Sequence, residues 1–190
     1  GHLAWRAEAI RNLQRELHCS VLIFDYRGYG RSEGEPSERG VLRDVRAAHA
    51  WLIERSGRPA EEIVLMGRSL GGGVVLDLAA ETSAAAVVVE STFTSLPDVA
   101  AVHYPWLPVR ALMRSRLNNL QRLAEYQGPI FFSHGDADTV VPFQFGRRLY
   151  EAATGEKQFF LVAGGGHNDP QPREYYRQLG AFLRGLSASD

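Results

Sequence analysis

Short apolar segments alternate with amphipathic segments along most of the chain. Apolar runs bounded by glycine or polar residues predict strands buried on both faces at 21–26, 63–66, 86–90, 130–134 and 158–162. Apolar positions three and four residues apart predict helices over 3–17, 41–52 with Ser37 as N-cap, 70–80, and from Pro172 to about residue 186. The alternation predicts an α/β fold built on a mostly parallel, doubly wound sheet.

One region interrupts this alternation. Residues 91–126 contain the turn Tyr104-Pro-Trp-Leu-Pro108, followed by an amphipathic stretch that carries Leu112, Leu117, Leu120 and Leu123. We interpret the region as a small helical cap inserted into a single domain that covers residues 1–190. Neither an internal repeat nor a low-complexity tract is present.

Composition and charge narrow the class of partner. The 190 residues are 45% apolar, and 21 basic side chains balance 22 acidic ones, so the overall charge gives no reason to expect nucleic acid or an anionic membrane as a partner. Cys19 is the only cysteine, which excludes an intrachain disulfide and a thiolate metal cluster. No His, Cys or carboxylate spacing suggests zinc. We therefore expect a small-molecule ligand, no metal and no cofactor.

The compartment and any contact with a membrane stay open. The chain has no apolar run of eighteen residues and no signal-like start, but it begins at Gly1 rather than at Met. We expect a cytoplasmic location for this segment, and an upstream targeting segment or membrane anchor stays open.

The strongest chemical signal is Gly67-Arg-Ser-Leu-Gly71, a Gly-x-Ser-x-Gly motif. Its chemistry needs a serine at the tip of a sharp strand-to-helix turn, and a predicted strand precedes the motif while a predicted helix follows it. Ser69 is then a nucleophile, and the backbone N–H of Leu70 can stabilise an oxyanion by about 3 kcal/mol. The alternative is a glycine-rich turn that binds an anion or only packs closely. We expect Arg68 to lie in solvent or beside the site.

Two later loops supply a base and carboxylates. Asp136 and Asp138 follow the strand predicted at 130–134, and His167 follows three glycines after the last predicted strand. The order Ser, Asp, His, each after its own strand, is typical of a serine hydrolase, in which His167 would move the serine proton. The other histidines outside this pattern are assigned structural or surface roles; they are His2, His18, His49 and His103.

With these motifs and the segment from Phe24 to Gly34, the chain resembles the α/β-hydrolase superfamily over about residues 1 to 186. The resemblance is to the ABHD-type serine hydrolases of the Bem-like, serine aminopeptidase-like subgroup. It implies that Asp138 is the orienting acid, that Asp136 forms a turn, and that Asp25 pairs with Arg27. It also implies that an acyl pocket is walled by residues for which core packing is the alternative role; they are Ser91, Tyr104, Trp106 and Leu107.

The resemblance implies hydrolysis of esters or thioesters through an acylated Ser69, without a cofactor. A serine aminopeptidase-like amide hydrolase uses the same three residues, and a non-catalytic binding protein could keep the fold. Both stay open as alternatives.

The resemblance also implies one more strand, between those at 21–26 and 63–66, and a His-Gly loop that gives the second oxyanion donor. This chain begins where that loop should end. We therefore expect these residues to be a segment of a longer protein, or to borrow a strand from a partner in a homo-oligomer or by strand exchange.

Overall fold

The computed structural model describes residues 7–187, which fall into two compact units. Unit 1 takes residues up to 58 together with those from 170 onward, and unit 2 takes residues 59–169. Both ends of the cap and all the residues of the predicted triad belong to unit 2. The expectation of one domain over residues 1–190 stays a prediction.

Unit 2 is built on a four-stranded parallel sheet. Its strands are β1 (Val64–Arg68), β2 (Ala86–Glu90), β3 (Ile130–Gly135) and β4 (Lys157–Val162), in the order β1-β2-β3-β4. Every residue of β2 and β3 is buried, as expected for continuous apolar runs in the middle of a parallel sheet. These four strands confirm four of the five strand predictions.

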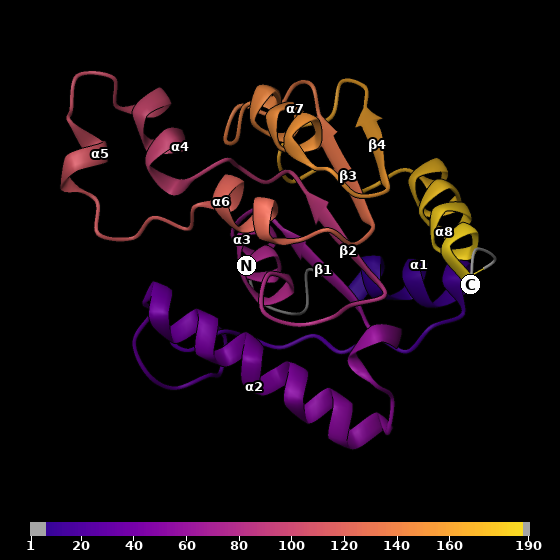
Figure 1. The fold of residues 1–190 in the computed structure, drawn as a ribbon. Coiled ribbons are helices and arrows are strands. Elements are labelled where there is room, and N and C mark those ends of the chain that lie inside the picture. Colours follow the sequence, from indigo (N-terminus) through magenta and orange to yellow (C-terminus); the bar gives the residue numbers. More distant parts are fainter. Residues whose placement is uncertain (1–6, 188–190) are drawn as a thin grey trace. The chain divides into compact units, whose positions relative to one another are not determined.

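Three helices follow one another along one face of this sheet (Figure 1). Helix α3 (Leu70–Ala79) packs on β1 and β2, α7 (Phe143–Ala152) packs on β3 and β4, and α6 (Asn119–Glu125) contacts both helices. The ring of Tyr150 on α7 meets Phe132 of β3 edge-on at 5.7 Å. Helix α7 was not predicted, although Phe145 and Leu149 form its buried stripe at a four-residue step.

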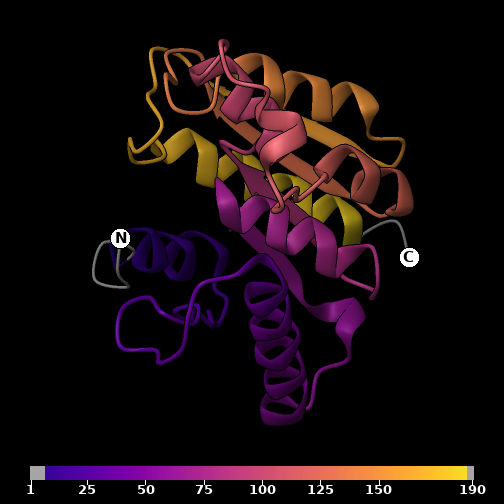
Figure 2. The same cartoon turned by 90° about the vertical axis from the view of Figure 1, so that its left-hand side faces the viewer.

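The region predicted as a cap contains two more helices, α4 (Leu96–His103) and α5 (Val109–Leu112). They project from the sheet in Figure 1 and face the viewer in Figure 2. Ser95 caps α4 by accepting a hydrogen bond from the N–H of Asp98 at 3.2 Å. The His103 ring Nε2 lies 2.8 Å from the carbonyl oxygen of Val140, which joins the cap to the loop after β3. A single turn of 3₁₀ helix, η2 (Ala60–Glu62), precedes β1.

Unit 1 contains α1 (Ala7–Leu17), α2 (Glu38–Ser56) and α8 (Arg173–Ser187). The N-cap prediction for α2 is confirmed, because Ser37 Oγ accepts a hydrogen bond from the N–H of Gly40 at 3.1 Å. Helices α1 and α8 pack together within the unit. The first residues of the helix predicted from residue 3 lie outside the described residues.

Two predictions for unit 1 are wrong. Residues 21–26 form no strand, and Leu22 and Ile23 stay 37% and 38% exposed. An apolar run becomes a strand only when a neighbour satisfies its backbone groups, and no described strand lies beside this one. Arg27 pairs with Asp44 rather than with Asp25, through Nη2–Oδ1 and Nε–Oδ1 distances of 2.6 and 3.0 Å. The partner lies on α2, seventeen residues away, where local spacing could not indicate it.

Candidate active site

The turn that carries Ser69 is held in a conformation that few side chains adopt. Ser69 has φ 53° and ψ −120°, and a strained backbone of this kind costs about 1–3 kcal/mol that the surroundings must offset. Its N–H donates to the carbonyl of Glu90 and its own carbonyl accepts from Thr92 Oγ1, both at 2.8 Å. A Cβ at Gly72 would lie 2.6 Å from the Cβ of Thr92, so the turn can pack this closely only with glycine there.

The loop after β3 presents a buried carboxylate. Asp138 Oδ1 accepts the backbone N–H groups of Val140 and Val141 at 2.9 and 2.8 Å, and its side chain is 0% exposed. The second oxygen, Oδ2, lies 2.7 Å from Nδ1 of His167. Because the two backbone donors occupy one oxygen, the other is left directed at the imidazole.

The loop after β4 brings His167 to the same edge of the sheet. Gly164 turns the chain with φ 68°, and its N–H donates to Asp136 Oδ1 at 2.6 Å. The N–H of Ala137 donates to the carbonyl of Gly165 at 3.1 Å, so the loops after β3 and β4 are bonded to each other. Asp136 therefore fixes the loop geometry, whereas the carboxylate that meets the imidazole is that of Asp138.

The three side chains form a continuous series of contacts. His167 Nε2 lies 3.0 Å from Ser69 Oγ, while its Nδ1 faces Asp138 Oδ2. The imidazole is 11% exposed, which leaves a small opening above a carboxylate that is shielded from water. With Nδ1–H donated to the carboxylate, Nε2 is the nitrogen able to accept the proton of Ser69.

Arg68 makes a connection that the sequence did not indicate. Its Nη2 donates to the carbonyl of His167 in a short contact and to the carbonyl of Asp169 at 2.9 Å. The guanidinium therefore joins the residue before Ser69 to the backbone of the loop that carries the imidazole. The sequence predicts this side chain in solvent or beside the site. Its place at a variable position of Gly-x-Ser-x-Gly gives no signal for a contact with the loop of His167.

His134 lies beneath the site as a second imidazole. Its buried ring places Nε2 at 2.8 Å from the carbonyl of Val141 and at 3.3 Å from Asp138 Oδ2. A carbonyl can only accept, so Nε2 carries the proton. Burial lowers the pKa of His134, since the charged form would be poorly solvated. Gly146 of α7 packs directly against the ring, and a Cβ there would overlap Nδ1.

The remaining predicted site residues lie in three places. Ser91 follows β2, is buried and has φ 45°, whereas Tyr104, Trp106 and Leu107 are exposed on the cap. Leu70 is the first residue of α3, where a backbone N–H has no partner within the helix. The substrate-binding and oxyanion roles assigned to these residues stay predictions.

Between residues 7 and 187, the structure shows neither a cluster of metal ligands nor a membrane-spanning helix. In that part of the chain, no three His, Cys, Asp or Glu side chains come together in a way that could hold a metal ion. None of the helices described there has the length and apolar character needed to span a membrane.

Comparisons with known proteins place this fold and motif set in a family. A family model described as the alpha/beta hydrolase family matches residues 1–186. An uncharacterised protein of Mycobacterium tuberculosis is 43% identical over 171 residues, which are 90% of this chain and 61% of that protein. The alpha/beta hydrolase domain-containing protein 17B of Xenopus laevis is 32% identical, over 90% of this chain and 58% of its own length.

A solved structure gives the same fold. The esterase of Pyrococcus furiosus superposes with a TM-score of 0.76 at 21% identity, covering 94% of this chain and 74% of that one. The predicted α/β-hydrolase fold is thereby confirmed, and the assignment to the Bem-like, serine aminopeptidase-like subgroup stays a prediction. The chain spans about three fifths of the length of these curated relatives, 61% and 58%. The match over residues 1–186 and the shared fold show that the chain belongs to the alpha/beta hydrolase family.

Proposed function

We propose that this chain is the core of a serine hydrolase that cleaves carboxylic esters or thioesters through an acyl-enzyme on Ser69. The observation that carries the proposal is the series of contacts from Ser69 Oγ to His167 Nε2, 3.0 Å, and from His167 Nδ1 to Asp138 Oδ2, 2.7 Å. The strained turn at Ser69 adds support, since a nucleophile elbow exposes its hydroxyl in this way.

The proposed reaction has two halves. In the first, His167 Nε2 takes the proton of Ser69 Oγ as that oxygen attacks the acyl carbon, and the tetrahedral oxyanion faces the N–H of Leu70. The C–O or C–S bond then breaks, and the leaving group receives the proton from His167. In the second half, water gives a proton to His167 and attacks the acyl carbon. The bond between that carbon and Ser69 Oγ then breaks, Oγ takes the proton from His167, and the carboxylic acid is released. Asp138 stabilises the imidazolium throughout and does not take the proton.

Four polar contacts keep this arrangement ready before substrate binds. The backbone N–H groups of Val140 and Val141 fix one oxygen of Asp138, and Arg68 holds the carbonyls of His167 and Asp169. Groups held in the reacting geometry lower the barrier, because the ordering has been completed during folding. We propose that Arg68 is a positioning residue in this sense.

The proposed reaction also needs a second oxyanion donor. Among the described strands, β1 pairs only with β2, and Val64 and Met66 on β1 are exposed apolar side chains. We propose that another strand pairs with β1 and brings the second donor, either from upstream residues of a longer protein or from a partner copy. The share of each curated relative that the chain spans, 61% and 58%, fits the first source.

A substrate panel tests the proposed class. The full-length protein is assayed with p-nitrophenyl esters, acyl thioesters and aminoacyl anilides of matched size, alongside Ser69→Ala and the exposed control Ser83→Ala. Ester or thioester turnover that is lost only in Ser69→Ala supports the proposal. Turnover of anilides alone replaces it with the aminopeptidase-like alternative, and no turnover by the folded protein favours a binding protein.

A further inference from the structure

We propose that the cap binds an anionic lipid surface through a set of exposed side chains, which we call the cap face. We define this cap face as four apolar residues, Tyr104, Trp106, Leu107 and Leu112, together with three arginines, Arg110, Arg114 and Arg116. All seven lie within unit 2 and within thirteen consecutive positions. The proposal concerns binding and does not rest on the proposed chemistry of Ser69.

The apolar members of the cap face are unusually exposed for side chains of their size. Trp106 is 72% exposed, Leu112 67% and Tyr104 51%, and the rings of Tyr104 and Trp106 meet edge-on at 5.9 Å. Single exposed apolar residues are common, but a cluster of large ones marks an interaction site. The segment is nevertheless folded, because Val109 and Leu117 on either side of Leu112 are buried. Its exposure is thus a property of an ordered surface.

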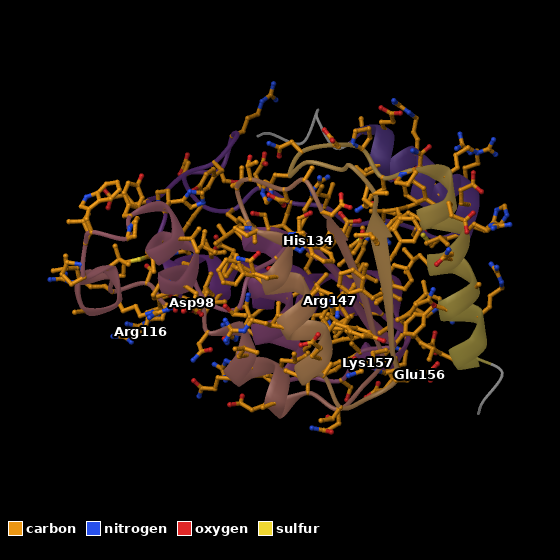
Figure 3. The ribbon with its side chains drawn as sticks, turned by 90° about the horizontal axis from the view of Figure 1, so that it is seen from above. Asp98, Arg116, His134, Arg147, Glu156 and Lys157 are labelled. Carbon is orange, nitrogen blue, oxygen red and sulfur yellow. The ribbon has the colours of Figure 1, made fainter. Side chains whose placement is uncertain are left out.

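Charge on the cap face selects the kind of partner. Between residues 99 and 117 there are three arginines and no acidic residue, although the whole chain carries a net charge of −1. All three arginines are exposed, and Arg110 also bonds Asp98 at 3.0 Å. In Figure 3, Asp98 and Arg116 lie at the cap end, well away from Lys157.

Aromatic rings beside arginines suit the boundary of a bilayer. Tryptophan and tyrosine place an apolar body among acyl chains and a polar atom among headgroups, and arginine reaches anionic phosphates from the same depth. Each basic residue near such a surface contributes on the order of 1 kcal/mol, which is about a fivefold change in binding. A nucleic acid would leave Leu112 without an apolar environment, so lipid is the occupant that uses all parts of the cap face.

The cap face also adjoins the loop that carries Asp138. His103, which precedes Tyr104, lies 2.8 Å from the carbonyl of Val140, and Val140 is itself exposed. Val140 is two residues from Asp138, whose Oδ1 accepts the Val140 N–H. A lipid surface resting on the cap face would therefore lie next to the candidate active site.

Vesicle sedimentation tests this inference. Every protein compared is full-length and carries Ser69→Ala, so that hydrolysis of lipid cannot change the amount bound. We expect binding to vesicles of phosphatidylglycerol and phosphatidylcholine, at least about tenfold weaker binding to phosphatidylcholine alone, and weakening by salt. The pair Trp106→Ser and Leu112→Ser should reduce binding at least about tenfold. Arg110→Gln with Arg114→Gln should remove most of the preference for anionic vesicles.

A matched control and three outcomes make the test decisive. Trp51→Ser removes a tryptophan that is 52% exposed in unit 1 and should leave binding unchanged. Equal binding by wild type and the Trp106/Leu112 variant overturns the inference. So does equal binding to neutral and anionic vesicles. Self-association that the same variant abolishes, without any vesicle binding by wild type, would instead assign the cap face to a second copy of the chain.

Discussion

The loops at the carboxyl edge of the sheet and the cap belong to the same unit, yet they differ in which groups they bury and which they expose. In the loops, polar atoms are buried and bonded: Asp138 is fully shielded and receives backbone N–H groups as well as the His167 ring. In the cap, large apolar groups such as Trp106 and Leu112 face solvent. The loops hold polar atoms in place by hydrogen bonds, whereas the cap presents exposed apolar side chains.

This difference separates two requirements of a hydrolase. The proposed proton transfer between Ser69 and His167 would tolerate little displacement, so it needs a bonded and buried environment. Recognition of an acyl chain or a lipid surface is less directional and needs apolar area above all. Changes in the loops should therefore affect the rate of reaction, and changes on the cap face should affect where the protein binds.

The largest effect should come from Asp138→Asn. An amide at this position favours the wrong tautomer of His167, and comparable changes lower kcat by about 10,000-fold. Steady-state ester hydrolysis measures this effect. Asp136→Asn is the matched control, because its amide oxygen can still accept the Gly164 N–H, and it should cost less than about tenfold. Equal losses in the two variants would contradict the assignment of Asp138 as the orienting acid.

A smaller loss of rate is expected for Arg68→Lys. The lysine ammonium ends one bond short of the position of Arg68 Nη2, so its bonds to the two carbonyls should weaken. The loop with His167 should then shift, and kcat should fall about 10- to 100-fold with KM nearly unchanged. Added guanidinium should restore part of the activity of Arg68→Ala. Arg147→Lys on α7, an exposed pair with Glu151, should change nothing. Wild-type kcat in Arg68→Lys would exclude the positioning role.

Gly72→Ala should lower the free energy of unfolding more than it changes binding by the cap face. The new methyl group would overlap Thr92, which bonds the carbonyl of Ser69, and overpacking of this kind costs about 1–3 kcal/mol of unfolding free energy. Urea unfolding measures the change. Gly185→Ala on α8 meets no atom within 4 Å and should be neutral or stabilising. If both variants were equally stable, the turn at Ser69 would be looser than its contacts imply.

The smallest effect should be the pH dependence of stability that arises from His134. Burial lowers its pKa from the ordinary 6.5, so the unfolded chain binds a proton more readily than the folded one, and stability should fall as the pH drops below about 6.5. The fall should continue down to the lowered native pKa. His134→Gln keeps a donor for Val141 and removes the titration, so its unfolding free energy should vary less between pH 7.5 and 5.5 than that of the wild type. Parallel pH profiles for the two proteins would show that His134 does not titrate in this range.

The sequence predicted the four strands of unit 2 and the loops that carry the three candidate residues. It could do so because Gly-x-Ser-x-Gly and the polar loops each follow an apolar run, and parallel strands end at one edge of their sheet. The run at 21–26 looks like the run at 63–66, yet only the latter is a strand. What separates them is a neighbouring strand, and a single segment carries no information about its neighbours.

Contacts that join distant segments were also missed. Arg68 reaches a loop 99 residues away, and the pairing of Arg27 with Asp44 on α2 depends on how one segment packs on another. The buried ring of His134 beside Asp138 follows from packing under α7, a helix that we did not predict. Local pattern thus found the candidate reactive groups, while the groups that hold them in place became visible only in three dimensions.

The most direct test of the central claim is the reactivity of Ser69. Full-length protein is treated with a fluorophosphonate and analysed by intact mass and peptide mapping, with Ser69→Ala, His167→Ala and Ser83→Ala in parallel. If Ser69 is the nucleophile, we expect one adduct per chain on Ser69 and no adduct in Ser69→Ala. Labelling should be slow in His167→Ala and as fast as in wild type in Ser83→Ala. A folded protein that takes up no label, or that is labelled elsewhere, would contradict this assignment.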